Sequence, residues 1–267
     1  TRGMPTVASP GAGVTWIAHE INRNWYSVTS SSDGTRLAAV VNGGQIYTSS
    51  DSGVTWTPRE SVRNWLGVAS SSDGTHLVAV SAAGTNSGQI YTSSDSGVTW
   101  TPRESNRGWQ TVAMSADGTK LVAGVANGQL YTSTDSGVTW TPRESSRIWV
   151  RVASSSDGTR LAAVAYTGQI YTSSDSGVTW TPRETTSDWF AVAMSADGSS
   201  LAYSCPSVQT YFYSGTGSLY FAENLQRIGA LSHGNAVDDH AHIVDTALNH
   251  LKHGLFLQAL FFGKQHA

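Results

Sequence analysis

The chain has 267 residues, of which 13% are charged, and its formal net charge is −3 at pH 7. This length allows one large domain or two smaller ones. The slightly acidic balance excludes the basic field that nucleic-acid binding requires. Cys205 is the only cysteine and has no partner for a disulfide within the chain. The longest apolar stretch, residues 254–263, is too short to predict a membrane-spanning helix.

An eight-residue string, Ser-x-Asp-x-Gly-Val-Thr-Trp, recurs along the chain, and we call it the Asp box. Its intact copies are Ser49–Trp56, Ser93–Trp100, Ser133–Trp140 and Ser173–Trp180, and a degenerate copy is Ser9–Trp16. A second tryptophan marks the same point in every repeat, at positions 25, 65, 109, 149 and 189. Self-similarity at a period of 40 to 44 residues is typical of propellers and repeat arrays.

Each repeat predicts four strands, and the third repeat is the clearest example. Its strands are Trp109–Met114, Lys120–Val125, Gln129–Ser133 and Val138–Pro142, separated by turns rich in Gly, Asn, Asp and Ser. The pattern starts again at each of the five marker tryptophans. The sequence therefore predicts an all-β, five-bladed β-propeller with four-stranded blades over residues 1–220.

The last blade lacks an intact outer strand of its own. We expect the N-terminal Val14–His19 to supply it, because such a closure removes the open sheet edges that invite aggregation. Ser214–Tyr220 keeps the spacing of a decayed box and is the alternative source of this strand. The sequence leaves both possibilities open.

The residue types of the Asp box suit a turn. Ser and Asp side chains hydrogen-bond backbone amides within turns, and Gly permits a positive φ. The final Trp has enough apolar area to dominate the local packing between sheets. We expect the boxes to stabilise turns and to bind no ligand.

The repeat Trp-x-x-Val…Gly-x-Ile/Leu-Tyr-Thr-Ser-x-Asp-Ser-Gly-Val-Thr-Trp resembles those of the Asp-box (BNR) propeller superfamily. The resemblance covers about residues 9–220. Among its members, the chain looks most like the photosystem II assembly factors of the Ycf48/HCF136 type. The superfamily also contains sialidases, sortilin-type receptors and other glycoside hydrolases, so the motif implies the fold more strongly than it implies a function.

Crossovers between blades read Thr-Pro-Arg-Glu-Ser/Thr-x-Arg-x-Trp and lie on one face of the predicted ring. In one interpretation, Arg and Glu pair across adjacent blades while Trp fills the blade interface. In the other, a ring of Arg and Trp near the channel mouth binds acidic peptides, carboxylates or sugars. The last crossover has Ser187 and Asp188 before its Trp, which leaves a gap. The candidate partner-binding residues are Arg23, Trp25, Arg63, Trp65, Arg107, Trp109, Arg147 and Trp149.

Arg151 is a further candidate, because small residues stand at its place in the other repeats: Ser27, Gly67, Thr111 and Ala191. An arginine near the axis needs a partner or open water. Arg151 therefore either binds a ligand in the channel or is a solvated side chain.

Residues 221–267 lose the repeat and form a predicted C-terminal helical extension, with a helix over Val237–Phe262. Six of the eight histidines of the chain lie here, yet no dense ligand spacing occurs, and we expect no metal and no cofactor. The apolar end should contact a partner, a membrane-embedded complex or the propeller itself, and we expect the first two. Its candidate contact residues are Leu255, Phe256, Phe261 and Phe262.

Near-identical repeats supply the same side chains each time, whereas catalysis needs unlike groups in unlike roles. We therefore expect no enzymatic activity. The expected function is a protein-binding scaffold or assembly module that docks on a larger, membrane-associated and photosynthetic complex. Its setting would be the thylakoid lumen, a plastid or another non-cytosolic compartment. The alternatives are a multivalent glycan-binding lectin and, third, a degenerate sialidase-like glycoside hydrolase.

Overall fold

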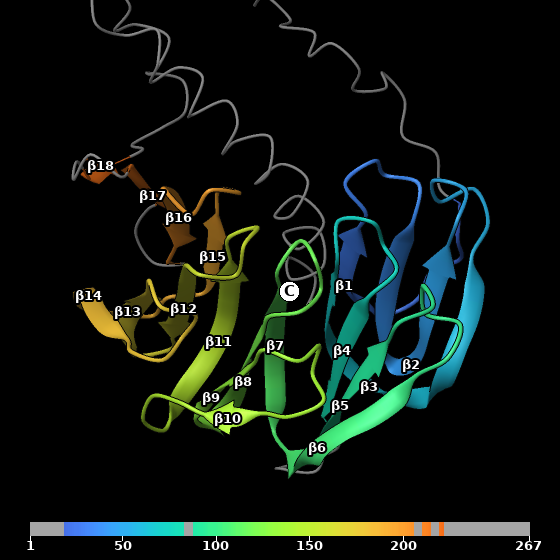
Figure 1. The fold of residues 1–267 in the computed structure, drawn as a ribbon, viewed down its shortest axis with the longest axis horizontal. Helices are drawn as coiled ribbons and strands as arrows, with labels where there is room; N and C mark the ends of the chain where they lie inside the picture. Colours follow the sequence, from blue (N-terminus) through green and yellow to red (C-terminus); the bar gives the residue numbers. More distant parts are fainter. Residues whose placement is uncertain (1–18, 83–87, 206–209, 215–218, 222–267) are drawn as a thin grey trace, which may run out of the picture.

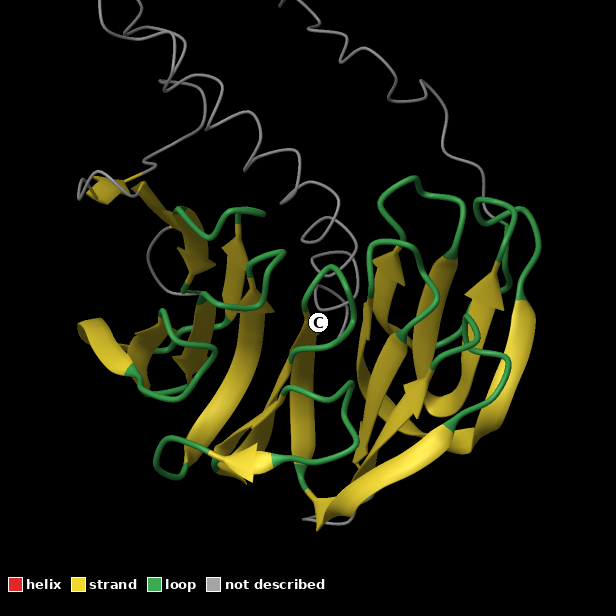
Figure 2. Ribbon diagram, viewed as in Figure 1, coloured by secondary structure: helices red, strands yellow, loops and turns green. Residues whose placement is uncertain are grey.

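The computed structural model describes residues 19–82, 88–205, 210–214 and 219–221 (Figure 1). Within these ranges the chain forms strands and loops, which confirms the all-β class (Figure 2). The same ranges contain no helix that could cross a membrane. The predicted helix Val237–Phe262 and the box copy Ser9–Trp16 lie outside the described residues.

The strands form three antiparallel sheets. The first follows chain order: β1 (Trp25–Ser30), β2 (Leu37–Ser49), β3 (Thr57–Ser70), β4 (Leu77–Ala82), β5 (Gly88–Ser93) and β6 (Thr101–Arg107). The second contains β7 (Trp109–Met114), β8 (Leu121–Gly128), β9 (Leu130–Ser133), β10 (Thr141–Pro142), β11 (Arg147–Ser154), β12 (Leu161–Ala165), β13 (Gly168–Ser173) and β14 (Thr181–Ser187). The third contains β15 (Ala191–Met194), β16 (Ser200–Ser204), β17 (Thr210–Ser214) and β18 (Leu219–Phe221).

These sheets are built from repeat units, which we number first to fifth from their leading tryptophans: Trp25, Trp65, Trp109, Trp149 and Trp189. Each of the second to fifth units pairs four antiparallel strands in order, as predicted. In the first unit, β2 spans both middle strands through the turn at Gly43, where φ is 74°. The outermost strands begin after the box tryptophan rather than at the box valine, because Val138 and its equivalents belong to the turn.

The outer strand of the fifth unit is β18, which pairs with β17 through Tyr211↔Phe221 and Tyr213↔Leu219. The expectation that Val14–His19 would pair with β17 is therefore wrong, and the alternative source within Ser214–Tyr220 is the one used. A hairpin between neighbouring segments closes a much shorter loop than pairing with the opposite end of the chain. Residues 1–18 lie outside the described part, so the closed five-bladed ring remains a prediction.

The units follow one another along an arc, from the first unit in blue, through the green strands, to the fifth unit in orange (Figure 1). Along the inside of the arc, the strands that begin each unit lie against one another: β1 against β3, β3 against β7, β7 against β11, and β11 against β15. This arrangement around a shared axis is that of a propeller.

The apolar core lies between units rather than within one sheet. Trp65 of the second unit packs with Val40 and Ile46 of the first. The same arrangement joins the later units, and Trp65, Trp109 and Trp149 are fully buried. Each such side chain contributes about 1.5–3 kcal/mol through its burial. The prediction that tryptophan fills the blade interface is confirmed for these three residues.

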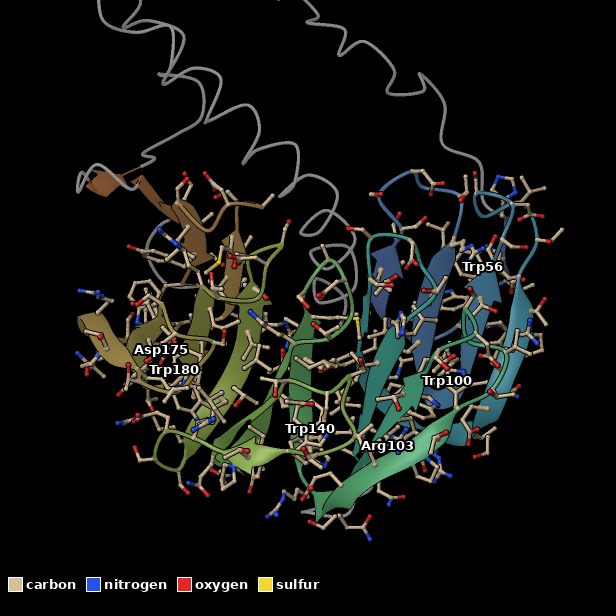
Figure 3. All side chains as sticks on the ribbon, viewed as in Figure 1. Trp56, Trp100, Arg103, Trp140, Asp175 and Trp180 are labelled. Atoms are coloured by element: carbon tan, nitrogen blue, oxygen red, sulfur yellow. The ribbon has the colours of Figure 1, made fainter. Side chains whose placement is uncertain are left out.

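The Asp-box turns have the expected hydrogen bonds. The Ser49 hydroxyl donates to Asp51 Oδ1 at 2.7 Å and accepts from the Gly53 N–H at 2.9 Å. Asp51 also accepts from the N–H of Thr55 at 2.9 Å, and the Trp56 indole N–H donates to the Gly53 carbonyl at 3.0 Å. The other three intact boxes repeat this network, and their tryptophans lie one to a unit around the arc (Figure 3).

A second set of turns links the units by backbone hydrogen bonds, which we call the amide ladder. The N–H of Ser32 donates to the carbonyl of Ser72 at 2.8 Å, and Ser72 donates in turn to Ala116 at 2.7 Å. The ladder continues from Ala116 to Ser156 and from Ser156 to Ala196, both at 2.7 Å. Each unit is thereby held to the next at the same turn.

Candidate functional site: a rim of stacked arginines

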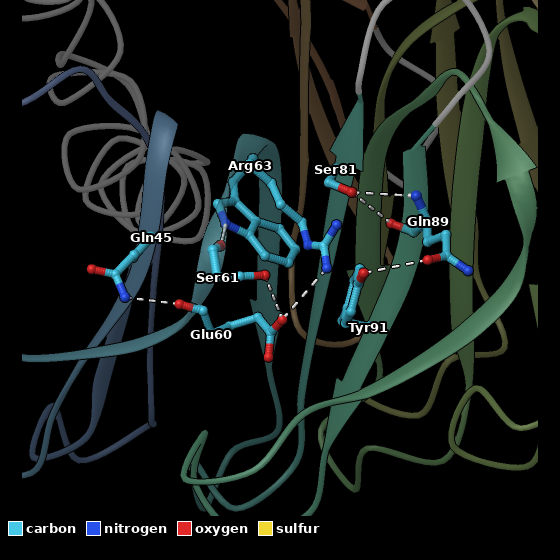
Figure 4. Close-up of polar contacts among 8 residues, drawn as sticks. Gln45, Glu60, Ser61, Arg63, Ser81, Gln89 and Tyr91 are labelled. Carbon is cyan, nitrogen blue, oxygen red and sulfur yellow. Dashed lines mark hydrogen bonds and ion pairs between the residues drawn. The ribbon is translucent and has the colours of Figure 1, made fainter.

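The crossover into the second unit holds an arginine over an aromatic pair (Figure 4). The guanidinium carbon of Arg63 lies 4.9 Å from the centroid of the Tyr91 ring. Tyr91 in turn meets the buried indole of Trp65 edge-on, with ring centroids 5.1 Å apart. The aromatic face attracts the cation by about 0.5–1 kcal/mol when such a pair is exposed. Arg63 is thus held by a platform of two aromatic rings.

The same stack recurs in the first, third and fourth units. Their arginine-to-ring distances are 4.5, 4.8 and 4.7 Å, for Arg23 over Tyr47, Arg107 over Tyr131 and Arg147 over Tyr171. The side chains of these arginines keep between 30% and 39% of their surface exposed. We call Arg23, Arg63, Arg107 and Arg147 the arginine rim.

Each rim arginine pairs with the glutamate three residues before it in the same crossover. Arg107 Nη2 lies 3.2 Å from Glu104 Oε1, and Arg63 Nη2 lies 3.7 Å from Glu60 Oε1. The expectation that Arg and Glu pair across adjacent blades is therefore wrong. Glu60 and Glu104 have a positive φ of 50°, but the pair also forms at Glu20 and Glu144, which do not, so the pairing follows the three-residue spacing rather than this backbone conformation. Partly exposed pairs of this kind contribute at most about 1 kcal/mol.

The rim is held at a cost in hydrogen bonding. The Nε atoms of Arg63, Arg107 and Arg147 are buried and have no hydrogen-bond partner. An unsatisfied buried donor costs about 1–3 kcal/mol. The tyrosine platform is also partly desolvated, and burial raises the pKa of Tyr91 while Arg63 opposes that rise. Each of these three arginines thus occupies a position in which its Nε–H donor lacks a hydrogen-bond acceptor.

The rim stops at the fifth unit, as the sequence indicates. Ser187 and Asp188 precede Trp189, whose ring meets Tyr203 edge-on at 5.2 Å in place of an arginine-bearing platform. Beside this gap, Arg151 extends from β11 of the fourth unit. Its guanidinium carbon lies 5.9 Å from the centroid of Phe190, the residue after Trp189.

Arg151 is partly buried. One Nη–H donates to the Val150 carbonyl at 2.8 Å, and the guanidinium shares a hydrogen bond with Tyr26. Burial lowers the pKa of Arg151, and the interaction with Tyr26 works in the opposite direction. Neither of these two oxygen partners is a carboxylate, so neither neutralises the positive charge of Arg151. The guanidinium lies near the aromatic rings of Tyr26 and Phe190.

The aspartates of the repeated turns accept hydrogen bonds from side chains and backbone N–H groups of the same turn. Among the described residues, every carboxyl whose pKa is displaced is displaced downward. The pKa of Asp51 falls to about 2, because the Thr55 hydroxyl, the Thr55 N–H and the Ser49 hydroxyl all donate to it. A general acid at neutral pH needs the opposite shift. No group of three side chains suited to a metal ion occurs in these ranges either.

The structure thus brings the sequence-predicted residues together in two ways. The arginines lie on the rim, while Trp65, Trp109 and Trp149 lie beneath it, buried. Trp25 is only half-buried. Sequence reasoning missed the platform tyrosines, although their period of 40 to 44 residues matches that of the arginines. Leu255, Phe256, Phe261 and Phe262 lie outside the described residues.

The fold, with its repeated box turns, is that of a β-propeller. Solved structures that resemble the chain include YCF48 bound to a D1 peptide, with a TM-score of 0.56 and 16% identity over 74% of this chain and 68% of that one. YCF48 from Cyanidioschyzon merolae matches with a TM-score of 0.56 and 16% identity, over 76% and 73% of the two chains. These likenesses agree with the resemblance to Ycf48-type propellers.

A glycoside hydrolase is also similar in fold. The GH74 enzyme of Niastella koreensis matches with a TM-score of 0.62 and 18% identity, over 74% of this chain but 37% of that enzyme. No family model and no curated protein matches the chain. At these identities the comparisons establish the fold, and the function must be argued from the residues.

Proposed function

We propose that this chain is a non-catalytic propeller that docks on a larger protein complex through the arginine rim and Arg151. The observation that carries the proposal is the repeated stack: four guanidinium groups held at the same place in successive units, each partly exposed over a tyrosine. Forked donors of this kind suit carboxylates. Equivalent sites on one scaffold gain avidity for a segment with several acidic residues.

The comparisons support this class of function without assigning the partner. One similar structure is YCF48 with a D1 peptide bound, so the same fold holds a peptide in that protein. We extend this to a membrane-associated, photosynthetic complex as the setting for the present chain. The acidic segment of such a partner would lie along the rim, with Arg151 beside the gap in the fifth unit.

The rival functions fit the site less well. A lectin would present aromatic faces to sugars, but the indoles of Trp65, Trp109 and Trp149 are fully buried. A glycoside hydrolase needs a carboxyl group kept protonated near neutral pH, whereas the displaced carboxyl pKa values in the described part all move down. The likeness to a GH74 enzyme reflects the shared fold.

The test compares two triple variants that remove the same charge. Arg63, Arg107 and Arg147 are changed to Ala in the rim variant. The control changes Arg59, Arg103 and Arg143, which donate their Nε–H groups to threonine hydroxyls on β2, β5 and β9 at 2.9–3.1 Å. Binding of a fluorescent peptide that alternates glutamate and glycine is measured by polarisation, and binding to solubilised thylakoid membranes by pull-down.

A charge-assisted hydrogen bond contributes about 1.5–3 kcal/mol. We therefore expect the rim variant to lose at least about 100-fold in peptide affinity and to release the membrane complex, with the control within about 3-fold of wild type. Equal losses of peptide affinity in both variants would show that binding depends on the overall positive charge and not on the position of the rim arginines. Unchanged binding in the rim variant would contradict the proposal, and specific binding on a glycan array would favour the lectin.

A further inference from the structure

One face of the first unit is more exposed than the same face of the following units. Val28 on β1 is 41% exposed, whereas the valines at its place in the next three units, Val68, Val112 and Val152, are 6%, 9% and 8% exposed. Trp25 and Leu37 are half-buried on the same face, while their equivalents in those units are buried. We call Trp25, Val28 and Leu37 the seam surface.

Elsewhere this face is covered by apolar side chains of the preceding unit, a Val–Ile pair at three of the interfaces, and Leu130 beside Gly124 where the third unit meets Trp149. Trp109 packs with Val80 and Ile90 of the second unit. Trp189 packs with Val164 and Ile170 of the fourth. All four preceding units supply a large apolar side chain at the position of Ile46, and a unit that closed the ring onto the seam surface would have to do the same.

The fifth unit does not supply a Val–Ile pair. In the first and fifth units, Val40 pairs with Ser27 and Ser204 pairs with Ala191, so Ser204 stands where Val40 does. Thr210 stands at the place of Ile46, directly before the repeated tyrosine. Closing the ring with this unit alone would bring two hydroxyl-bearing residue types to positions that are mostly apolar in the other units, which is unfavourable unless both hydroxyl groups find partners.

Two features of the turns agree with an uncovered seam. A methyl group added at Gly34 would meet nothing within 4 Å, whereas at Gly118 it would lie 2.6 Å from the His76 Cβ. Ser200 stands in the fifth unit where the first has Arg36 and the second His76. The amide ladder also ends here, because it begins with the Ser32 N–H and finishes at the Ala196 carbonyl.

We propose that the seam surface is the docking site for the apolar end of this same chain, residues 255–262. The described part ends on β18, the last strand of the fifth unit, so the chain leaves from the unit that would face the seam. Residues 222–254 provide ample reach, since an extended chain spans up to about 3.3–3.6 Å per residue. The docking segment carries Leu255, Phe256, Leu257, Leu260, Phe261 and Phe262.

The chemistry of the two surfaces is complementary. The seam surface needs large apolar side chains in place of the absent Val–Ile pair, and burying each such side chain is favourable. Six exposed ones would form a patch that soluble proteins rarely keep. Residues 1–18 carry fewer large apolar side chains, Met4, Val7, Val14, Trp16 and Ile17, spread over fourteen positions rather than concentrated within eight.

Photo-crosslinking on the purified full chain, with no partner present, tests the proposal. Benzoylphenylalanine replaces Val28 in one variant and Val54 in the control, a valine of the first Asp box that is 59% exposed. After irradiation and digestion, crosslinked peptides are identified by mass spectrometry. We expect position 28 to crosslink to peptides that contain residues 255–262, and position 54 not to do so.

Crosslinks from position 28 to residues 1–18, to a second copy of the chain, or to nothing would each overturn the proposal. A second measurement uses Val28→Asp with Val54→Asp as its control. Limited chymotrypsin digestion after Phe256 should become about 10-fold faster in Val28→Asp alone, because a carboxylate on the seam surface releases the tail. Equal cleavage rates in the two variants would also contradict docking at this place.

Discussion

The guanidinium of Arg151 on β11 hydrogen-bonds the side chain of Tyr26 on β1, which joins the fourth unit to the first across the inside of the arc. Arg151 also lies near Phe190 of the fifth unit, at 5.9 Å. Arg151, a side chain of the fourth unit, thus contacts both the first unit and the fifth unit. The contact depends on an arginine that replaces the small residues of the other repeats.

We predict that this pair is energetically coupled. Tyr26→Phe and Arg151→Gln should each destabilise the chain, and together they should cost about 1–2 kcal/mol less than the sum of the single variants, because both break the same hydrogen bond. Urea unfolding of the wild type, the two single variants and the double variant measures this. Tyr166→Phe, at a tyrosine that is 44% exposed, is the control. Additivity within about 0.3 kcal/mol would show that the bond contributes nothing.

Acid should unfold the chain through its turn aspartates. The Asp51 and Asp175 carboxyl groups have pKa values lowered from 3.8 to about 2, chiefly by donation from the hydroxyl groups of Thr55 and Thr179. Because the folded pKa is the lower one, the stabilisation is fully present above pH about 4 and is lost as pH falls toward 2.

The urea midpoint should therefore change little from pH 6 to pH 5 and fall steeply below pH 4. Repeating the series in 1 M NaCl should leave this fall in place, because neutral hydroxyl and amide donors hold the carboxylates. A fall that disappears in high salt would assign it to ion pairs instead.

Removing an interface tryptophan should be severe, whereas removing a box valine should not. Trp109→Ala deletes a fully buried indole between the second and third units, at an expected cost of about 3–5 kcal/mol. Val138→Ala changes a side chain that is 54% exposed and should stay within about 0.5 kcal/mol of wild type. Calorimetry of both variants checks this, and comparable melting temperatures would contradict a core that lies between units.

Two glycines with the same backbone shape should respond differently to alanine. Gly34 and Gly118 have φ values of 72° and 76°, so both substitutions carry the strain of a left-handed conformation. Gly118→Ala also presses on His76 and should cost about 1–3 kcal/mol more, whereas Gly34→Ala meets nothing. Chemical unfolding measures the difference, and equal losses would show that the turn of the first unit is covered.

Local and repeated features were predictable from the sequence. The Asp-box turn depends on hydrogen bonds that each span at most four positions, so Ser49, Asp51 and Thr55 indicate it directly. The marker tryptophans likewise predict the inner strands and the interface core. The Arg–Glu pairing was not predicted, because the crossover sequence alone does not indicate whether a glutamate turns toward the arginine of its own crossover or toward that of the next unit. The source of the outer strand of the fifth unit was not predictable, because two segments far apart in the sequence could each supply it. The exposed seam surface was also not predicted, because it depends on two single replacements, Ser204 and Thr210 in place of Val40 and Ile46.

The amide ladder has a direction, since every link runs from the N–H of one unit to the carbonyl of the next. All four links have nearly the same length, 2.7 or 2.8 Å, so the geometry of a link does not differ with its position along the chain. A duplicated repeat inserted in the middle would find the same donor behind it and the same acceptor ahead. The four links of the ladder therefore set no limit of their own on how many units follow one another.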